Sequence, residues 1–433
     1  MEYIKRITDQ VIDKRNKAFN AINVIGPKGC GKTRTCKERC KSVIEFQDEG
    51  KRDGFLQIAD TAPDLFFSNE KPILFDEWQD APKVWGAIRK DCDDNPEDTG
   101  SYYLTGSSSK QVKTAHTGTG RISTLTMYPM TLWESGDSDG SISLSELFKN
   151  NKLPNATNSL ELEDYFYIIC RGGWPRCLSI RDKEAKLEVA KDYHRQIYTK
   201  DINDIDDTKR NPELTRTILW SYARNNATTA KKSSIYADIQ ATQSASDPTL
   251  NSYILRLEEL FVLKDIDAWT PAIRSKTAIR SSKKHIFVDP SIATASLGLS
   301  PDYFRNDLDT FGHMFENLVL RDLLAYAEAH NAHVKHYRDD MGLEADAIYE
   351  LEDGRYALIE IKTGTNKIAE AEKNLLSFKN LIRKHNEEAS SDKKHPGIIY
   401  REPSLMIVIC ANAPYAYVTD NGVMVIPFAC LKD

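Results

Sequence analysis

The sequence predicts an α/β protein built around a parallel sheet, and three observations support that prediction. A short apolar run at residues 21–25 leads directly into a glycine-rich loop that ends in lysine and threonine. Further apolar runs of strand length recur at residues 73–75 and 102–104. Helical stretches separate these runs, and strands that alternate with helices favour parallel pairing with helices on both faces. Ligands of such sheets usually bind at the carboxyl ends of the strands.

Length and composition indicate a multidomain globular protein. The 433 residues suffice for roughly two to four domains, because domains typically run about 100–200 residues. No apolar run approaches the roughly 18 residues of a membrane span, and residues 1–19 lack the apolar core of a signal peptide. We therefore expect a cytoplasmic protein with no membrane contact.

Net charge and cysteine spacing give little information about the class of function. The net charge of −6 gives no global argument for nucleic-acid binding, so local basic stretches would have to supply one. The eight cysteines show no usual zinc spacing, and we expect reduced thiols.

The glycine-rich loop has the Gly-x-x-x-x-Gly-Lys-Thr order of a phosphate-binding loop, or Walker A motif. Its glycines allow backbone amides to point at phosphate oxygens. We expect Lys32 to reach the β- and γ-phosphates of ATP and the Thr33 hydroxyl to ligate Mg2+. The predicted nucleotide-binding residues are Gly26, Pro27, Lys28, Gly29, Cys30, Gly31, Lys32 and Thr33.

The apolar strand near residue 75 ends in Asp76 and Glu77, the pattern of a Walker B motif. We expect Asp76 to hold Mg2+ through water and Glu77 to polarise the attacking water. The alternative is a strand that happens to end in an acidic turn.

Two further polar positions follow in the same part of the chain. Thr105 and Ser107 come directly after a strand, where a γ-phosphate sensor is expected. Arg121 precedes a strand at residues 122–128 and is either an arginine finger or a surface charge. Both interpretations of Arg121 stay open at this point.

These motifs together resemble a prokaryotic AAA-plus ATPase family related to the archaeal-type ATPases. The segments that carry the resemblance are residues 26–33, 73–77, 104–108, 120–121 and 128–130. It implies four domains. They are a P-loop AAA-plus core at residues 1–137, a helical lid at 138–208, a winged helix at 209–296 and a PD-(D/E)XK nuclease-like α/β domain at 297–433.

The resemblance also implies a role for a glycine-rich segment in the lid. In the family a similar segment lies near the adenine, so Gly172, Gly173 and Pro175 are expected to border the nucleotide. The residues alone indicate a plain turn between helices equally well.

Three helical stretches and two short strands together predict the winged helix. The helices are expected at residues 213–224, 233–243 and 247–260, and the strands at 261–264 and 285–289. Such a domain often places its third helix in the DNA major groove, and the alternative is a packing or protein-contact module. The basic residues expected to border DNA phosphates are Lys231, Lys232, Arg274, Lys276, Arg280, Lys283 and Lys284.

The last third of the chain carries a second set of charged residues. Glu360 and Lys362 lie two apart on a predicted strand, so both side chains point to one face. Asp346 precedes the neighbouring strand, and Glu316 lies on a helix at residues 311–327. The alternative is a solvated strand edge with paired charges.

This set resembles the core of PD-(D/E)XK nucleases, in which an Asp and a Glu hold Mg2+ and a Lys positions or deprotonates water. The resemblance implies that Glu316, Asp346 and Glu360 are metal ligands. It also implies that Asp346, Glu360 and Lys362 are catalytic.

The sequence thus predicts an ATP-binding and ATP-hydrolysing protein that acts on DNA with a Mg2+-dependent nuclease-like domain. The rival prediction is a STAND-like nucleotide-controlled switch or scaffold that binds DNA or protein without cleaving it. A third is a homo-oligomeric motor in which Arg121 acts across a subunit boundary.

Overall fold

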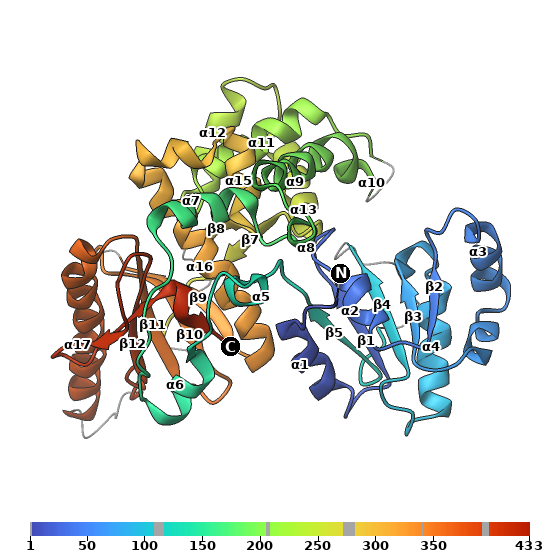
Figure 1. Ribbon diagram of the computed structural model, residues 1–433, viewed down its shortest axis with the longest axis horizontal. Coiled ribbons are helices and arrows are strands. Elements are labelled where there is room, and N and C mark those ends of the chain that lie inside the picture. The colour runs from blue at the N-terminus through green and yellow to red at the C-terminus, as the bar shows by residue number, and fades with distance from the viewer. Residues whose placement is uncertain (1, 108–116, 205–207, 272–281, 340, 392–397) are drawn as a thin grey trace.

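The computed structural model describes residues 2–107, 117–204, 208–271, 282–339, 341–391 and 398–433. Figure 1 shows two sheets at opposite ends of the molecule, with a group of helices across the top between them. The N-terminal part of the chain forms one end and the C-terminal part forms the other. Among the described residues, every helix is too short or too polar to cross a membrane.

The N-terminal sheet has five parallel strands in the order β2-β3-β4-β1-β5. This confirms the predicted parallel α/β sheet. The strands are β1 (Ala21–Ile25), β2 (Ser42–Glu45), β3 (Ile73–Asp76), β4 (Tyr102–Gly106) and β5 (Ile122–Thr126). The helices of this part are α1 (Ile7–Arg15), α2 (Lys32–Lys37), α3 (Arg52–Thr61) and α4 (Lys83–Asp94).

Both faces of the central strands β1, β3 and β4 are buried, which explains why these three strands are mostly apolar. Alternate residues enter different cores. Phe75 packs with α4 on one face, whereas its neighbour Leu74 packs with Val11 and Ile12 of α1 on the other. The sheet therefore holds the carboxyl ends of β1, β3 and β4 side by side at one edge.

The helices in the upper part of Figure 1 come from the middle of the chain. They are α7 (Leu162–Arg171), α8 (Pro175–Leu178), α9 (Lys183–Gln196), α10 (Ile202–Asp204), α11 (Pro212–Arg224), α12 (Lys232–Gln240), α13 (Asp247–Glu259) and α15 (Pro290–Leu297). Strands β7 (Leu263–Ile266) and β8 (Lys284–Phe287) form an antiparallel hairpin after α13. The three helices and the hairpin expected at residues 209–296 are present, and their assignment to a winged helix stays a prediction.

The C-terminal sheet has the order β13-β14-β12-β11-β10-β9. Its elements are α16 (Leu308–His330), β9 (His333–Arg338), β10 (Glu344–Glu350), β11 (Tyr356–Lys362), α17 (Ile368–Ser391), β12 (Leu405–Cys410), β13 (Tyr417–Val418) and β14 (Met424–Pro427). Strands β9, β10 and β11 are antiparallel neighbours, and α17 carries the chain over so that β12 pairs parallel with β11. Alternate residues of β11 face the core containing α16 and the core containing α17.

The connection between the first sheet and the helices passes over the second sheet. After α5 (Leu132–Ser135), the short strand β6 (Ile142–Ser143) pairs with β15 (Leu431–Lys432), and α6 (Leu144–Asn150) follows. The Asn158 amide then donates to the Pro414 carbonyl at 2.9 Å. The first part of the segment expected as a lid at 138–208 thus contacts the C-terminal region. The domain limits themselves stay a prediction.

A buried ion network joins the three parts of the molecule. The guanidinium of Arg321 on α16 pairs with Asp289 at 2.9 Å and with Asp322 at 2.7 Å. Asp289 also accepts the Gly173 amide at 2.9 Å, and Asp322 accepts the Leu132 amide at 2.8 Å. The network thereby holds α5, α15, α16 and the segment before α8 together.

We predict that Gly173→Ala destabilises the chain. A Cβ at this position would lie 2.2 Å from the Met130 carbonyl oxygen, and the backbone there cannot move without disturbing the ion network. We expect a loss of about 3 kcal/mol or more in the free energy of unfolding, measured by chemical denaturation. Gly54→Ala in α3 is the control, because a Cβ there meets nothing within 4 Å. Equal stability of the two variants would contradict the prediction.

Candidate functional site

The phosphate-binding loop connects β1 to α2 at the carboxyl edge of the N-terminal sheet. Its path requires glycine at Gly26 and Gly31, which have φ of 150° and 108°. A Cβ on Gly26 would also lie 2.2 Å from the Met127 carbonyl oxygen. The glycines predicted from the motif are therefore needed for both backbone conformation and close packing.

Lys32 is folded back over this loop. Its side chain is buried, and its ammonium donates to the Gly26 and Pro27 carbonyls at 2.9 Å each. The ammonium thus lies within the loop, where the motif predicts contact with phosphates.

The other predicted site residues of this region lie together, with the exception of Arg121. The Thr33 hydroxyl donates to Asp76 Oδ1 at 2.7 Å, and the Thr105 hydroxyl donates to the same oxygen. Glu77 Oε2 accepts the Ser107 amide at 3.2 Å and the Ser107 hydroxyl at 3.1 Å. Residues from the carboxyl ends of β3 and β4 and the start of α2 therefore surround one place.

The oxygen donors at this place suit Mg2+. The Thr33 hydroxyl and the Asp76 carboxylate already lie within 2.7 Å of each other, and hydroxyl, carboxylate and water oxygens are the ligands that Mg2+ prefers. The residues present therefore fit the predicted ion.

A cavity of about 540 Å³ lies beside the loop. Gly31, Pro175 and Tyr3 are among the residues that line it, so of the three lid residues expected to border the nucleotide, Pro175 does lie next to the loop. Gly172 and Gly173 do not line this cavity. They pack against Asp289, Ser291 and Met130 instead. Their backbone lies so close to these residues that a side chain at either position would have no room.

No sequence pattern predicted that two N-terminal residues, Arg6 and Tyr3, contribute to this site. The Arg6 guanidinium donates to the Cys30 carbonyl at 2.7 Å and pairs with Glu134 at 2.9 Å. The Tyr3 hydroxyl donates to Thr35 of α2 at 3.0 Å. Because these partners are far apart in sequence, spacing could not reveal them. Lys28 extends the loop's contacts to the helices through an ion pair with Asp201 at 2.6 Å.

Arg121 lies away from this site. It precedes β5, and its carbonyl accepts the amide of Ala21 at the amino end of β1, whereas the loop follows the carboxyl end of β1. Its guanidinium pairs with Asp93 at 2.6 Å. In its own chain Arg121 thus lies at the edge of the sheet opposite to the loop, in an ion pair typical of the surface-charge alternative. Action on a neighbouring chain stays a prediction.

The four charged residues predicted in the C-terminal region form a second cluster. The Lys362 ammonium lies 3.1 Å from Asp346 Oδ2 and 2.5 Å from Glu360 Oε2. The same Asp346 oxygen accepts the Ile361 amide at 2.7 Å. Glu316 of α16 joins the cluster through Lys284, whose ammonium contacts Glu316 and lies 3.0 Å from the Asp346 carbonyl.

The pairing of β9 and β10 explains how Asp346 reaches its neighbours. The register between these strands shifts between Ala345 and Ile348. A bulge of this kind turns a side chain away from the regular alternation of the strand. Asp346 lies in the shifted segment and directs its carboxylate toward β11.

Lys284 corrects one expectation from the sequence. It was expected at a basic border for DNA phosphates, but it is buried in the cluster. Of the other border residues, Lys231 and Lys232 are exposed, and Lys283 pairs with Asp267 at 3.0 Å. Arg274, Lys276 and Arg280 lie outside the described residues.

The third helix of the expected winged helix offers little positive charge. Its exposed residues are Asp247, Pro248, Thr249, Asn251, Ser252 and Leu255. Arg256 is partly buried and pairs with Glu259. Since DNA phosphates are contacted mainly by lysine and arginine, this helix gives no electrostatic support for the expected groove contact.

Burial changes the proton affinities of the second cluster. Burial and the Asp346 charge raise the pKa of Glu360 to about 8, and burial raises that of Glu316 to about 7. Burial also opposes ionisation of Asp346, but the ammonium groups of Lys362 and Lys284 lower its pKa below the ordinary value. Glu360 and Glu316 therefore hold a proton more tightly than an ordinary glutamate does, whereas Asp346 ionises more readily than an ordinary aspartate.

The second cluster offers two acidic side chains, those of Asp346 and Glu360, that suit a divalent cation. Within the described ranges, no three His, Cys, Asp or Glu side chains are grouped to hold a metal ion. Mg2+ in enzymes is commonly bound by one or two carboxylates plus water and substrate phosphates. Asp346 and Glu360 already share one cation, the Lys362 ammonium, and the buried Glu360 Oε1 has no hydrogen-bond partner.

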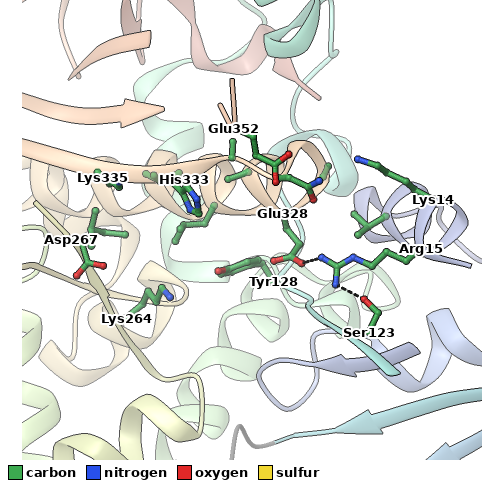
Figure 2. Close-up of a pocket in the computed structure, with 18 of the residues that line it drawn as sticks. Lys14, Arg15, Ser123, Tyr128, Lys264, Asp267, Glu328, His333, Lys335 and Glu352 are labelled. Carbon is green, nitrogen blue, oxygen red and sulfur yellow. Dashed lines mark hydrogen bonds and ion pairs between the residues drawn. The ribbon is translucent and has the colours of Figure 1, made fainter. Parts of the chain in front are cut away.

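Two further cavities lie between parts of the molecule. One of about 900 Å³ opens onto Glu316, Asp346 and Lys284 and is bordered by Lys231 and Arg338. Figure 2 shows the other, of about 680 Å³, where α1 and β5 face α16 and β9. Arg15 spans this second cavity by pairing with Glu328 at 2.8 Å, but none of the predicted site residues lines it.

Comparison with known families divides the chain into three matched parts. Residues 18–135 match the model of an AAA domain. Residues 162–303 and 311–431 match two domains of unknown function, DUF8612 and DUF4143. The N-terminal part is therefore similar to an AAA domain with a P-loop, and ATP is the cofactor that this similarity implies. No curated protein matches the chain.

Two solved structures are similar to parts of the chain. The Walker-type ATPase PABY2304 of Pyrococcus abyssi is 12% identical, covering 68% of this chain and 96% of that chain with a TM-score of 0.41. PCH-2 of C. elegans is 14% identical, covering 58% of this chain and 65% of that chain with a TM-score of 0.19. Neither similarity is close enough to support an argument about this chain.

We predict that Glu360 makes the fold less stable as the pH rises. An unfolded glutamate loses its proton near pH 4.5, whereas folded Glu360 keeps it to about pH 8. The folded state binds more protons in this window, so the free energy of unfolding falls as pH rises through it. Each unit of pKa shift corresponds to about 1.4 kcal/mol, so the contribution amounts to several kcal/mol.

Glu360→Gln should remove this fall, seen as the difference between variant and wild type in denaturation curves from pH 5 to pH 8. That difference isolates Glu360 from the histidines His194 and His336, whose low pKa values have the opposite effect. Glu370→Gln, at an exposed position on α17, is the control. Parallel curves for wild type and Glu360→Gln would refute the prediction.

Proposed function

We propose that this chain binds and hydrolyses ATP at residues 26–33 and acts on DNA through its C-terminal cluster. One observation carries the proposal: two sets of residues predicted from separate motifs each converge on one place. The first set lies at the carboxyl edge of a parallel sheet that matches an AAA domain. The second lies at the β10–β11 pair, beside a cavity with basic residues at its border.

At the first place, each side chain has a position that suits hydrolysis. Lys32 lies inside the loop, where its ammonium can neutralise phosphate charge once its bonds to the Gly26 and Pro27 carbonyls are exchanged. Glu77 is held by Ser107 and can accept a proton from water. Bound Mg2+ would supply charge neutralisation at the β- and γ-phosphates, and Thr33 and Asp76 would hold it. The cavity lined by Tyr3 and Pro175 suits the base.

At the second place, the residues suit phosphodiester hydrolysis. Asp346 and Glu360 would hold a divalent cation, which supplies Lewis-acid activation of water and phosphate when bound. Lys362 lies between the two carboxylates and can orient the attacking water. The order helix, three antiparallel strands, helix, parallel strand, from α16 to β12, supports a nuclease-like domain. Lys231 and Arg338 at the cavity border would attract the DNA backbone.

The second candidate function is a nucleotide-controlled switch that binds DNA or protein without cleaving it. Two observations favour it: the carboxylates are paired with lysines, and no three metal-binding side chains are grouped in the described part of the chain. This candidate shares the ATP site and differs only at the second cluster.

We predict that Lys32→Ala weakens ATP binding. Removing a charged hydrogen-bond donor should lower affinity roughly tenfold to a hundredfold, measured by titration calorimetry with ATP and Mg2+. Lys37→Ala, at an outer position of α2 paired with Glu45, should bind as wild type does. Glu77→Gln should still bind ATP but hydrolyse it at least about a hundredfold more slowly. Unchanged affinity in Lys32→Ala would refute the ATP site.

We predict Mg2+-dependent DNA cleavage that requires Lys362. Linear, circular and single-stranded DNA would be incubated with the full chain and Mg2+ or Mn2+, with and without ATP. Lys362→Ala should reduce cleavage by about a hundredfold or more, whereas Lys367→Ala, exposed nearby, should not. Absence of cleavage with every substrate, in protein that binds ATP, would favour the switch.

A further inference from the structure

Lys284 brings a positive charge into the second cluster from another part of the molecule. It begins β8 of the hairpin, whereas Glu316, Asp346 and Glu360 belong to α16 and the C-terminal sheet. Its side chain is only 9% exposed, and its ammonium contacts Glu316 and the Asp346 carbonyl.

The position of Lys284 is fixed by backbone pairing on both sides of the hairpin. The Trp269 amide donates to the His336 carbonyl of β9 at 2.7 Å, and the His336 amide donates to the Asp267 carbonyl at 3.0 Å. On the other side, the His285 amide donates to the Thr228 carbonyl at 2.9 Å. The hairpin is thus bonded to the edge of the sheet, and these bonds hold the backbone of Lys284 beside the cluster.

The charges divide the cluster into two halves. In one half, Asp346 and Glu360 share the Lys362 ammonium, and Glu360 Oε1 has no hydrogen-bond partner. In the other half, Glu316 is paired with Lys284. The half with the unsatisfied oxygen therefore keeps an acceptor for a further ligand, and the half with Lys284 already holds a paired carboxylate.

A pair of metal ions at one site lies about 3.5–4 Å apart. A second ion in this cluster would bind Glu316, the carboxylate of the four-residue cluster that the first ion does not use, at the place where the Lys284 ammonium lies. Repulsion between an ammonium group and a divalent ion is strong at this separation in a buried site.

We propose that Lys284 takes the place of a second metal ion, so that the cluster binds one divalent cation, at Asp346 and Glu360. This inference rests on the proposed function, since it concerns the ion that the second cluster holds. It makes Lys284 a positioning residue that sets the metal stoichiometry of the site from a separate part of the chain.

The test is Mn2+ stoichiometry in the full chain without nucleotide. Asp76→Asn is present throughout to remove the metal ligand of the ATP site. Bound Mn2+ is counted by calorimetry and by electron paramagnetic resonance. The count for Asp346→Asn/Glu360→Gln is subtracted as surface background.

We expect one ion in the starting protein and two after Lys284→Met, because Glu316 then becomes available. The double change Lys284→Met/Glu316→Gln should return the count to one, since it removes the second ion's ligand. Should Lys284→Met fail to fold, Lys284→Gln, which keeps a hydrogen-bond donor without the charge, carries the same expectation.

The outcomes separate this inference from the proposed function. One ion in both the starting protein and Lys284→Met, or two ions in the starting protein, overturns the inference and leaves the metal site standing. No ion above background in the starting protein overturns the proposed metal site and the inference with it.

Discussion

The buried ion network around Arg321 is the contact on which the arrangement of the molecule depends. A buried charge is tolerated only when it is paired and its remaining hydrogen-bonding atoms are satisfied. Arg321 meets this condition with Asp289 and Asp322, and each carboxylate also accepts a backbone amide from a different segment. Loss of Arg321 would leave two buried carboxylates without a counter-charge, and loss of either backbone amide would remove a hydrogen bond from one of them. The segments that supply these groups are therefore held in one relative position.

This network also lies between the two candidate sites. On one side, Asp322 bonds the amide that begins α5, and Glu134 of α5 pairs with Arg6, which bonds the Cys30 carbonyl in the loop. On the other side, the helix that carries Asp322 also carries Glu316. Coupling between sites further requires an element with two arrangements. The Lys28–Asp201 ion pair is suited to this role, because bound phosphates would compete with Asp201 for the ammonium.

The sequence predicted the site residues whose positions follow from the direction of parallel strands or from the alternation of side chains along one strand. Asp76 and Thr105 follow parallel strands, so their meeting beside the loop could be expected. Glu360 and Lys362 lie two residues apart on one strand, so their side chains share a face. Lys284 could not be placed this way, because all four residues of β8 are buried and alternation does not distinguish an inner from an outer face. Arg6 bonds Glu134 across 128 positions of sequence, which no local pattern reveals.

The Gly172-Gly173 segment shows how a motif can serve a site without touching it. The sequence left a turn and a nucleotide contact as equal alternatives. In the structure, Gly173 packs against the Met130 carbonyl, and its amide bonds Asp289, so the segment is fixed to the ion network. The chain then enters α8 with Pro175 first, and Pro175 lines the cavity beside Gly31. The glycines therefore set the position of Pro175, and through it the shape of the space expected for the base.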